Sequence, residues 1–504
     1  MTISPPTPSS PSRTETNTPE HSDNCIVGAP AGAPIDLLLV NAPLRDYARR
    51  PRINDFTLPV LGMGYLATYA AAQGFTVGVL DGESRGLGID RIQEIINQAA
   101  PRWVGFNLLA PTYALSARIA AGIDTGIQVM VGGHQAKAMP EAVIADPRFA
   151  RLEALVIGEG ETRVAELLED RHRRVRLPGV MWRDPILQSP VTGGVPGMAW
   201  HLAPDINALP FVDRRFFAAD PYQPDGGPLE AAMVGARGCP YDCSFCGAAV
   251  SANPDVTIRT REPSNIIAEM DEVHARYGVT AFRFVDDLFL GHERFIRRCM
   301  AAFTEADIGG RYVWDATGRI NILTRSEDAL LELLAANGCR EVAIGVESGS
   351  ERILRHIGKR IRPEWTRNVV DRLTRLGIDV KGYFILGLPT ETHDDLEATV
   401  RHIHELWDLT ENSSGRFRAS VFEFRPYPGT PEWQRLLATG RYDSAQLLDY
   451  TAVDLTSDGL DEAMRDRDEF NFSVNLQFGE VELSHVRRRL VELARAQHQR
   501  LVNR

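Results

Sequence analysis

Three cysteines lie within eight residues near the middle of the chain, in the run Cys239-Pro240-Tyr241-Asp242-Cys243-Ser244-Phe245-Cys246. Thiolate is a soft ligand, and three thiolates on one short loop suit iron or zinc. A structural zinc site normally takes four protein ligands, and a ferredoxin-type cluster takes four cysteines. Cys239, Cys243 and Cys246 therefore leave one metal position open to a cofactor or a substrate, which indicates a catalytic centre.

The other three cysteines do not complete this set. Cys25 lies in a segment rich in Ser, Thr and Pro, Cys299 lies in a helical run, and Cys339 enters an apolar strand. We interpret each of them as a small buried or incidental residue. Six cysteines are also too few and too unevenly spaced for a disulfide framework in a chain of 504 residues.

The elements around the cysteine loop alternate between strand and helix. Apolar strands are predicted at 231–236, 281–285, 312–315, 341–346, 380–386 and 420–424, with helices between them such as 263–277, 293–305 and 392–406. Six β-α units predict an incomplete parallel barrel, which places catalytic groups on the loops after its strands. The cysteine loop directly follows the first of these strands.

An earlier alternation predicts a second α/β unit over residues 34–170. Its strands are expected at 35–40, 76–80, 103–108, 128–131 and 154–157, and helices near 64–73, 89–99 and 115–121 separate them. The fold class is therefore α/β, with an amino-terminal doubly wound parallel sheet before the partial (β/α)6 barrel.

The remaining segments complete the predicted domain organisation. We expect a disordered tail over 1–33, a linker over 171–228, the barrel over 229–435 and a small helical cap over 436–504. Within the cap, a helix is expected at 483–502, and 470–475 are interpreted as covering the barrel mouth.

Composition narrows the function classes. The chain is 44% apolar and carries a net charge of −12, which disfavours nucleic acid as a partner because its phosphates are themselves negative. No charge-free apolar run approaches the ~20 residues of a membrane span, and the first residues lack the apolar core of a signal peptide. These patterns predict a cytoplasmic enzyme with a small-molecule substrate and no membrane partner.

The cysteine loop and its surroundings resemble the radical S-adenosylmethionine (SAM) superfamily over about residues 231–430. The signature of that family is a Cys-x3-Cys-x2-Cys loop after the first barrel strand, with an aromatic residue before the third cysteine, here Phe245. Further matches follow in the family's order, namely Phe284–Asp287, Gly345–Ser350, Phe384–Thr392 and Arg425–Thr430.

This resemblance implies a set of cofactors and the residues that bind them. Cys239, Cys243 and Cys246 would hold a 4Fe-4S cluster, at which SAM is cleaved with an electron from a low-potential donor such as flavodoxin or ferredoxin. Phe245 would lie near the adenine, and Asp286, Glu347 and Ser348 would contact SAM. Lys381 or Arg319 would meet the SAM carboxylate. As alternatives, the carboxylates Asp286, Asp287 and Glu347 would serve as helix caps or surface groups, and the two cations as solvated charges.

Residues 34–170 resemble the cobalamin-binding-type domain that precedes many radical SAM domains. The matching segments are Val40–Pro43, Leu61–Leu66, Ala110–Tyr113, Val131–His134 and Gly158–Glu161. Gly132 and Gly133 would let a corrinoid approach the backbone, and Pro111 and Thr112 would lie near its lower face.

The Asp-x-His-x-x-Gly signature of a lower axial histidine is missing from this domain. We therefore predict no histidine ligand to cobalt and interpret His134 as an ordinary loop residue. The alternative is a degenerate domain that keeps the fold and binds nothing.

The resemblance favours a cobalamin-dependent radical SAM methyltransferase, an enzyme of antibiotic biosynthesis or other secondary metabolism. One SAM would methylate cobalt, and a second would yield the radical that abstracts hydrogen from an unactivated carbon. The alternatives are a dehydration, deoxygenation or epimerisation of a sugar-like, aminoglycoside-type intermediate without methyl transfer, and a non-catalytic iron-sulfur or cobalamin-binding regulator. A tRNA-modifying enzyme is disfavoured because the sequence contains neither a second cysteine triad nor a basic appended domain.

Overall fold

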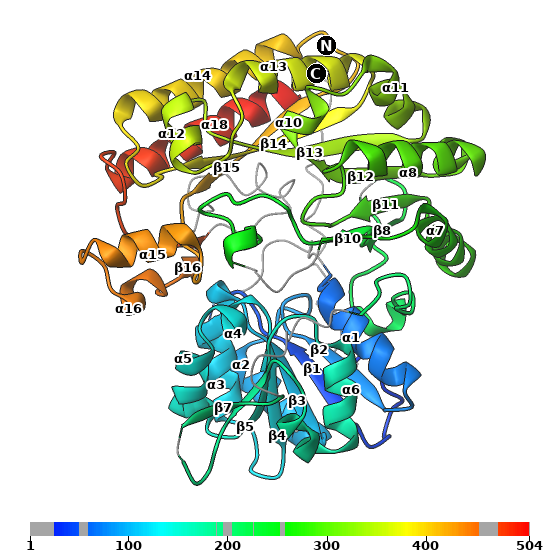
Figure 1. Cartoon of the computed structure of the whole chain (residues 1–504), viewed down its shortest axis with the longest axis vertical. Coiled ribbons are helices and arrows are strands. Elements are labelled where there is room, and N and C mark those ends of the chain that lie inside the picture. The colour runs from blue at the N-terminus through cyan, green and yellow to red at the C-terminus, as the bar shows by residue number, and fades with distance from the viewer. Residues whose placement is uncertain are drawn as a thin grey trace, which may run out of the picture.

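Two β-sheets with helical coverings build the protein, one in each of two lobes (Figure 1). The computed structural model describes residues 25–49, 59–187, 189–194, 204–224, 226–252, 258–452 and 472–502. No helix within these ranges combines the length and the apolar character that crossing a membrane requires.

The amino-terminal lobe contains the predicted parallel sheet. Its parallel strands are β1 (Leu37–Asn41), β2 (Val77–Asp81), β3 (Trp103–Asn107), β4 (Gln128–Gly132) and β5 (Leu152–Val156). Its helices are α1 (Leu61–Ala72), α2 (Ile89–Ala99), α3 (Tyr113–Ala121), α4 (His134–Ala138), α5 (Pro140–Ala145) and α6 (Glu161–Glu169).

Both faces of this sheet are covered, as a doubly wound sheet requires. Leu38 and Val40 belong to one buried cluster and Leu37 and Leu39 to another, because successive side chains of a strand point to opposite faces. The strand order β2-β1-β3-β4-β5 reverses direction between β1 and β3. Such a reversal opens a crevice at the carboxyl ends of the strands, where ligands bind in open α/β sheets.

The predicted linker contributes to this sheet, which corrects the interpretation of 171–228 as irregular. Strands β6 (Val180–Arg183) and β7 (Pro190–Thr192) continue it beyond β5, and both run antiparallel to their neighbours. The sheet is therefore mixed at one edge. The reason is local, because a short hairpin needs only a tight turn and no helical crossover.

The predicted tail is also shorter than expected. Val27 exchanges two backbone hydrogen bonds of 2.9 Å with Val79 at the edge of β2. Cys25 and Ile26 pack against the same lobe. Residues 25–33 thus belong to the first lobe, while residues 1–24 lie outside the described part of the chain.

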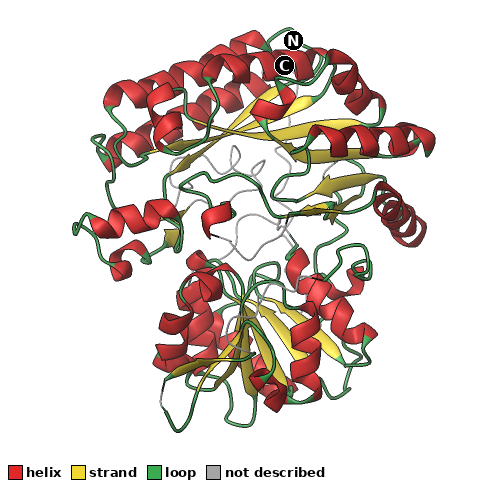
Figure 2. Ribbon diagram, in the orientation of Figure 1, coloured by secondary structure: helices red, strands yellow, loops and turns green. Residues whose placement is uncertain are grey.

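The second lobe is the predicted partial barrel. Its parallel strands, in the order β15-β14-β13-β12-β11-β8, are β8 (Glu230–Met233), β11 (Ala281–Phe284), β12 (Val313–Gly318), β13 (Cys339–Glu347), β14 (Asp379–Leu386) and β15 (Phe417–Glu423). The short strands β9 (Ala236–Arg237) and β10 (Arg259–Thr260) pair antiparallel beside it. Helices line the outer face of this curved sheet (Figure 2). They include α7 (Pro263–Tyr277), α8 (Glu293–Glu305), α9 (Ile308–Arg311), α10 (Ile320–Leu323), α11 (Asp328–Ala336), α12 (Glu351–His356), α13 (Pro363–Arg375) and α14 (His393–Leu409).

The carboxy-terminal helix has a different role from the predicted cap. Helix α18 (Leu483–Val502) packs on the outer side of β15, near α14 (Figure 1). Its residues Val486, Leu490 and Leu493 belong to the barrel core. The helix thus covers the last strand of the barrel, because an edge strand with an apolar outer face needs a partner. Of the stretch 470–475, which was interpreted as covering the barrel mouth, residues 470 and 471 lie outside the described part of the chain, and Phe472 lies on the wall of a cavity described below. The remaining elements are α15 (Pro431–Ala438), α16 (Ser444–Leu447), β16 (Thr451–Ala452) and β17 (Phe472–Ser473).

A buried network of charges ties the chain before β8 to helix α7. Arg214 pairs with Asp220, and Arg261 pairs with Glu269, all four side chains being almost completely buried. Arg214 also lies 3.9 Å from Glu269, so the two pairs form one cluster. Asp220 accepts a hydrogen bond of 3.1 Å from the backbone of Ala232 in β8. The segment between the lobes is therefore anchored to the first barrel strand.

Glu269 is the residue of this network whose loss tests it most directly. Glu269→Ala leaves two buried guanidinium groups short of an anion, so we expect the barrel to lose about 3 to 5 kcal/mol of stability. Urea unfolding followed by circular dichroism measures this loss. Glu272→Ala, on the same helix with an exposed ion pair to Arg276 at 3.3 Å, is the control and should change stability by less than about 1 kcal/mol. Equal losses of stability in the two variants would show that Glu269 has no special role in the buried network.

Candidate active site

The cysteine loop is held by other parts of the barrel. The backbone of Ser244 donates to the carbonyl of Ile357 at the end of α12, over 2.9 Å. The Ser244 hydroxyl donates to Glu432 in α15 over 2.9 Å, and the backbone of Glu432 donates back to Ser244 over 2.9 Å. Within the loop, Cys246 donates to the carbonyl of Cys243 over 3.1 Å. Helices from two later barrel units therefore fix the centre of the loop.

The three predicted ligands are free thiols, and burial disfavours the thiolate form of two of them, Cys239 and Cys246. Cys243 is buried, while Cys239 and Cys246 are partly buried. Burial raises the pKa of Cys239, and it raises the pKa of Cys246 to about 12. Cys239 and Cys246 are therefore neutral at pH 7 in the protein alone. A metal centre would displace their protons on binding, as thiolate ligation requires.

Arg319 is the cation at this loop, and it follows β12. It donates to the Cys243 sulfur over 3.6 Å and to the carbonyl of Lys359 over 2.8 Å. Its guanidinium also stacks on the Tyr241 ring at 3.5 Å. A buried cation against a sulfur ligand fits an anionic iron-sulfur cluster, whose potential depends on such contacts. The structure thus places Arg319 beside a cysteine, whereas the sequence analysis considered it for the SAM carboxylate.

Glu347 lies at the end of β13 in a strained conformation. Its φ is +66°, in the left-handed region, and the pairing of β13 with β14 shifts register at this point. The carboxylate meets the ammonium group of Lys359 at 2.6 Å, with both side chains largely buried. A Cβ at Gly345 would lie 2.2 Å from the Glu347 oxygen, so the absence of a side chain there leaves space for the ion pair as it is placed. Lys359 was not among the predicted residues, and it links Glu347 to the loop region.

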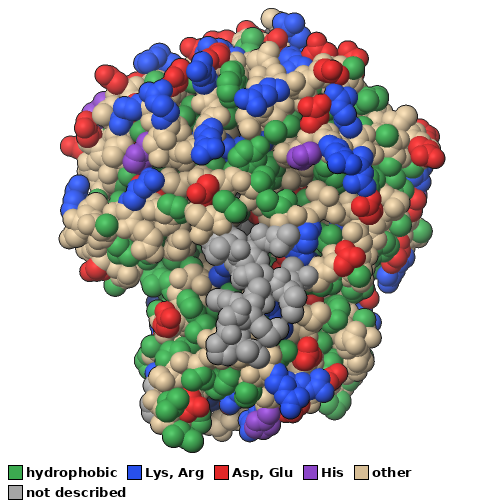
Figure 3. Space-filling model, viewed as in Figure 1, with side chains coloured by type: hydrophobic (Ala, Val, Ile, Leu, Met, Phe, Trp, Pro, Cys, Tyr) green, Lys and Arg blue, Asp and Glu red, His purple; other side chains and the backbone are tan. Residues whose placement is uncertain are grey.

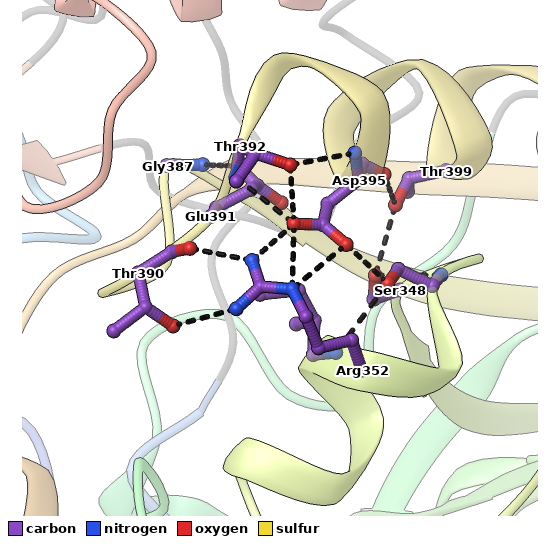
Figure 4. Close-up of polar contacts among 10 residues, drawn as sticks. Ser348, Arg352, Gly387, Thr390, Glu391, Thr392, Asp395 and Thr399 are labelled. Atoms are coloured by element: carbon purple, nitrogen blue, oxygen red, sulfur yellow. Dashed lines mark hydrogen bonds and ion pairs between the residues drawn. The ribbon is translucent and has the colours of Figure 1, made fainter.

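Ser348 has a different environment from the one predicted for a cofactor contact. Its side chain is fully buried, and its hydroxyl lies 2.9 Å from that of Thr399 in α14. It also accepts from the backbone of Ser350 over 3.1 Å. Figure 4 shows this hydroxyl turned toward α14. The geometry assigns Ser348 to the packing of β13 against α14.

The same close-up shows how the ends of β13 and β14 are joined (Figure 4). Asp395 accepts hydrogen bonds from Arg352, Ser350 and Thr392. Although burial raises its pKa, these donors hold the pKa of Asp395 well below its usual range. Glu391 accepts from the backbone of Gly387 over 2.6 Å, and burial raises its pKa to about 8. The loop after β14 is thereby fixed to the loop after β13.

The two neighbouring aspartates after β11 have opposite environments. Asp286 is buried and accepts from the backbone of Gly235 over 2.8 Å, so it holds the turn between β8 and β9. Burial raises its pKa well above the usual value. Asp287 is exposed and lines both of the cavities described below. Both aspartates thus line the sheet cavity, and of the two Asp287 also lines the loop cavity, whereas Asp286 was the one expected to contact SAM.

The remaining predicted SAM contacts lie within the barrel. Phe245 is partly buried and packs against the barrel core. Lys381 is buried on β14, with its ammonium group 5.2 Å from the centre of the Tyr383 ring. Their contacts with SAM stay predictions.

A first cavity, the sheet cavity, lies at the carboxyl ends of β3 and β4. Its volume is about 370 Å³, and Gly132, Gly133 and the turn 158–161 form part of its wall. Arg237, Gly238 and 285–287 of the second lobe complete it. Gly133 has a φ of +95°, and a Cβ there would lie 2.4 Å from the Asn107 side chain. Only glycine fits this close approach of backbone segments.

A second cavity, the loop cavity, lies between the lobes beside the cysteine loop. Its volume is about 460 Å³. The amino-terminal lobe contributes residues 109–111 and His134, while Gly247 and Ala248 follow Cys246 directly. Pro111 lines this cavity, and its contact with a corrinoid stays a prediction. Thr112 is buried, and its hydroxyl bonds to the carbonyl of Leu109 over 3.4 Å.

His134 has a more prominent position than the sequence indicated. It begins α4 and lies on the wall of the loop cavity rather than in an ordinary loop. Burial lowers its pKa, and the nearby Lys137 lowers it further, against the opposing effect of Asp287. The imidazole is therefore neutral at pH 7.

These cavities fit a large neutral cofactor that spans both lobes. Glu161 is almost fully buried on the wall of the sheet cavity. Its Oε2 atom accepts no hydrogen bond within the described part of the chain. A buried carboxylate oxygen without a donor is costly, so this wall is suited to a ligand that brings an N–H or O–H group. The amide and hydroxyl groups of a corrinoid have that chemistry.

Four charged side chains join the lobes next to the cysteine loop. Arg237 lies 2.6 Å from Glu159 and 2.9 Å from Glu161, and Arg259 also pairs with Glu159. The Arg237 guanidinium lies over the Tyr65 ring of α1 at 4.7 Å. Although burial lowers the pKa of Arg237, Glu161 and Glu159 hold it above its ordinary value.

Two parts of the chain match known families. Residues 55–168 match the B12 binding domain, and residues 233–403 match the radical SAM superfamily. The solved structure of the radical SAM methyltransferase TsrM from Kitasatospora setae, with cobalamin and a [4Fe-4S] cluster bound, has a similar fold. Its TM-score is 0.60 at 20% identity, over 84% of this chain and 81% of that chain.

Curated relatives include methyltransferases and a cyclase. The uncharacterized methyltransferase PH0819 of Pyrococcus horikoshii is 28% identical over 83% of this chain and 86% of its own length. The cytidylyl-2-hydroxyethylphosphonate methyltransferase of Streptomyces wedmorensis is 25% identical over 77% and 79%. The anaerobic magnesium-protoporphyrin IX monomethyl ester cyclase of Rubrivivax gelatinosus is 27% identical over 68% and 61%.

The fold, the cysteine loop and these matches agree with one another. The amino-terminal sheet with its glycine-lined cavity is the B12 binding domain, and the partial barrel with the three thiols is the radical SAM domain. These matches confirm the cofactors expected from the sequence, which are a 4Fe-4S cluster, SAM and cobalamin. The chain thus joins a radical SAM domain to an amino-terminal B12 binding domain, and methyltransferases are among its homologues.

Proposed function

We propose that the protein is a cobalamin-dependent radical SAM methyltransferase that adds a methyl group to an unactivated carbon of a small molecule. The observation that carries this proposal is the loop cavity. It touches the B12 binding domain at residues 109–111 and the segment directly after Cys246 at Gly247 and Ala248. A methyl carrier and a radical source must both reach the reacting carbon, and this cavity is open to both lobes.

The cofactors supply the radical chemistry and the methyl group, and the chain's residues bind and orient them. Cys239, Cys243 and Cys246 would hold the cluster, with Arg319 compensating its negative charge at Cys243. Glu347, fixed by Lys359, would take the ribose hydroxyls of SAM. Gly132, Gly133 and Glu161 would bind cobalamin on the sheet side, and Pro111 would lie against it on the loop side. Cofactors and substrate that fill these cavities would keep bulk water away from the radical.

The substrate is proposed to be a small molecule of secondary metabolism, such as an antibiotic intermediate, in the cytoplasm. A low-potential donor such as flavodoxin or ferredoxin would supply the electron. On the face shown in Figure 3, acidic and basic side chains are interspersed over the larger lobe. A mixed surface of this kind does not favour a nucleic-acid backbone as substrate, which agrees with the net charge of −12.

The main alternative is a radical reaction without methyl transfer, such as a dehydration, deoxygenation or epimerisation. The relative from Rubrivivax gelatinosus, which is a cyclase, is the observation that keeps it in consideration. The two functions share the cluster and SAM, so they differ only in their products.

The products formed from SAM distinguish these functions. We expect reduced, reconstituted protein with cobalamin and its substrate to form 5′-deoxyadenosine and S-adenosylhomocysteine in about equal amounts. The reason is that one SAM supplies the radical and another supplies the methyl group. Liquid chromatography with mass spectrometry measures both. Formation of 5′-deoxyadenosine alone would support the alternative and contradict methyl transfer.

The three cysteines are expected to be individually essential for the cluster. Cys239→Ala, Cys243→Ala and Cys246→Ala should each lower the iron content from four atoms per chain to nearly none, because two thiolates do not hold a stable cube. Iron analysis and the absorbance of the reconstituted cluster provide the measurement. Cys299→Ala and Cys339→Ala are the controls, since both thiols are buried in the barrel core. Full iron in a triad variant, or loss of iron in a folded control, would count against the assignment.

Cobalamin is expected to bind without a histidine ligand to cobalt. Protein mixed with hydroxocobalamin and passed through gel filtration should retain about one corrinoid per chain. His134→Ala should leave the cobalt(II) paramagnetic resonance spectrum unchanged, because a nitrogen ligand would add a resolved splitting that we do not expect. This test is sharp because His134 lies on the wall of the loop cavity. Loss of a nitrogen splitting in the variant would show that His134 is the ligand.

A further inference from the structure

The segments on either side of the cysteine loop are both fastened to one carboxylate of the other lobe. Arg237 in β9 precedes Cys239 by two residues, and Arg259 in β10 lies directly opposite Arg237 in the β9–β10 ladder. Both guanidinium groups pair with Glu159 of the B12 binding domain. One arginine thus precedes the cysteine loop and one follows it, and the same glutamate of the other lobe binds both.

A second carboxylate connects this pair to the sheet cavity. Glu161 uses Oε1 to bind Arg237 over 2.9 Å, while its Oε2 accepts no hydrogen bond from the described residues. Glu159, Glu161, Arg237 and Gly238 all line the sheet cavity together with Gly132 and Gly133. Glu161 thus belongs to the wall of the sheet cavity, and its Oε1 atom is connected to the cysteine loop through Arg237.

We propose that Glu159, Glu161, Arg237 and Arg259, here called the neck clamp, form a positioning device that sets the cysteine loop according to the occupant of the sheet cavity. An N–H or O–H donor of the occupant bonds to Glu161 Oε2 and orders the carboxylate that holds Arg237. Arg237 then fixes the backbone that leads into Cys239. The occupant's identity as cobalamin rests on the proposed function, whereas the connection between Glu161, Arg237 and the loop does not.

Two features of the clamp make it a specific link rather than a surface ion pair. The side chains are 4% to 18% exposed, so solvent screens their attraction weakly. The Arg237 guanidinium also lies over the Tyr65 ring while one of its nitrogens meets both carboxylates, a combination that an ammonium group on a shorter stem does not reproduce. Movement of either carboxylate is therefore transmitted to β9 as a change of position.

The first experiment uses protein that carries the cluster but no cobalamin. Arg237→Gln should keep four irons per chain, because all three cysteines remain, while its apparent dissociation constant for SAM rises about tenfold. The paramagnetic resonance spectrum of its reduced cluster, with and without SAM, should be broader than that of the wild type. Glu153→Gln is the control, since Glu153 pairs with Arg174 at 2.7 Å in the same lobe and lines neither cavity. It should match the wild type.

The second experiment tests the connection to the sheet cavity with hydroxocobalamin as the probe. Glu161→Gln should bind it about tenfold more weakly, as expected for the loss of a hydrogen bond to a charged group. In the wild type, saturating hydroxocobalamin should tighten SAM binding, and by linkage SAM should tighten cobalamin binding by the same factor. In Arg237→Gln both effects should vanish, while Glu153→Gln should retain them.

These results separate the clamp from the proposed function. If Arg237→Gln and Glu153→Gln have the same SAM affinity and the same cluster spectrum, the clamp proposal is wrong whatever cobalamin does. If the wild type binds no hydroxocobalamin, the methyltransferase proposal fails, and the cobalamin-free comparison still decides the role of Arg237. Should Arg237→Gln fail to fold, Arg237→Lys keeps the charge without the planar fork. Wild-type SAM affinity and spectrum in that variant would overturn the proposal.

Discussion

Three thiols on a loop of irregular structure, one of them buried and two partly buried, have to be kept in place by groups outside the loop. Ser244 is fastened to α15 through Glu432, and the Ser244 backbone is fastened to the end of α12 at Ile357. Arg319 adds a cation at Cys243, and Arg237 fixes the entrance of the loop. Preorganisation of this kind comes from rigid elements that support the ligand residues. The barrel can be understood as the frame that brings these supports to one loop.

Burying charged side chains near the cysteine loop costs desolvation free energy, which is offset where a buried anion is paired with a buried cation. Glu347 and Lys359 are almost buried and lie 2.6 Å apart, and Gly345 leaves them the space to meet. A buried ion pair contributes little to stability compared with apolar residues of the same size. The strained φ of Glu347 adds a further local cost. Strain and buried charge at the end of a barrel strand are typical of a binding site rather than of a framework.

Much of the fold could be predicted from the sequence, because the signal was periodic and local. Helices α2, α7 and α8 begin and end where the apolar pattern predicts, and each has a strong apolar stripe ending at a turn or a capping residue. The order of both sheets follows from β-α alternation. Strands β6 and β7 were missed because they are short, and α18 forms at the expected residues although a helix pattern does not say which strand it will cover.

The site was predictable only where its residues lie close together in sequence. The spacing of the three cysteines was sufficient to identify the loop. Arg319, Lys359 and Glu432, however, lie 73 to 186 residues beyond Cys246 in the sequence. No local pattern connects them to it. The pair Asp286 and Asp287 shows the same limit, since the sequence cannot tell which of two adjacent carboxylates turns into the protein. In the folded protein, the hydrogen bond from the Gly235 backbone shows that Asp286 is the carboxylate that turns inward.

Both cavities have walls built by residues of both lobes, and the segment that joins the lobes keeps these walls in place. Two lobes joined by a free linker are expected to move relative to each other. Here Leu209 and Val212 pack with Tyr65 of α1, and the backbone of Asp213 donates to Thr68 of α1 over 3.0 Å. A few residues later Arg214 enters the buried charge cluster beneath α7. The joining segment is thus fixed to both lobes within six residues, so the loops after the strands of one sheet face those of the other at a spacing set by buried groups. A reaction that takes ligands from both lobes requires such a fixed spacing.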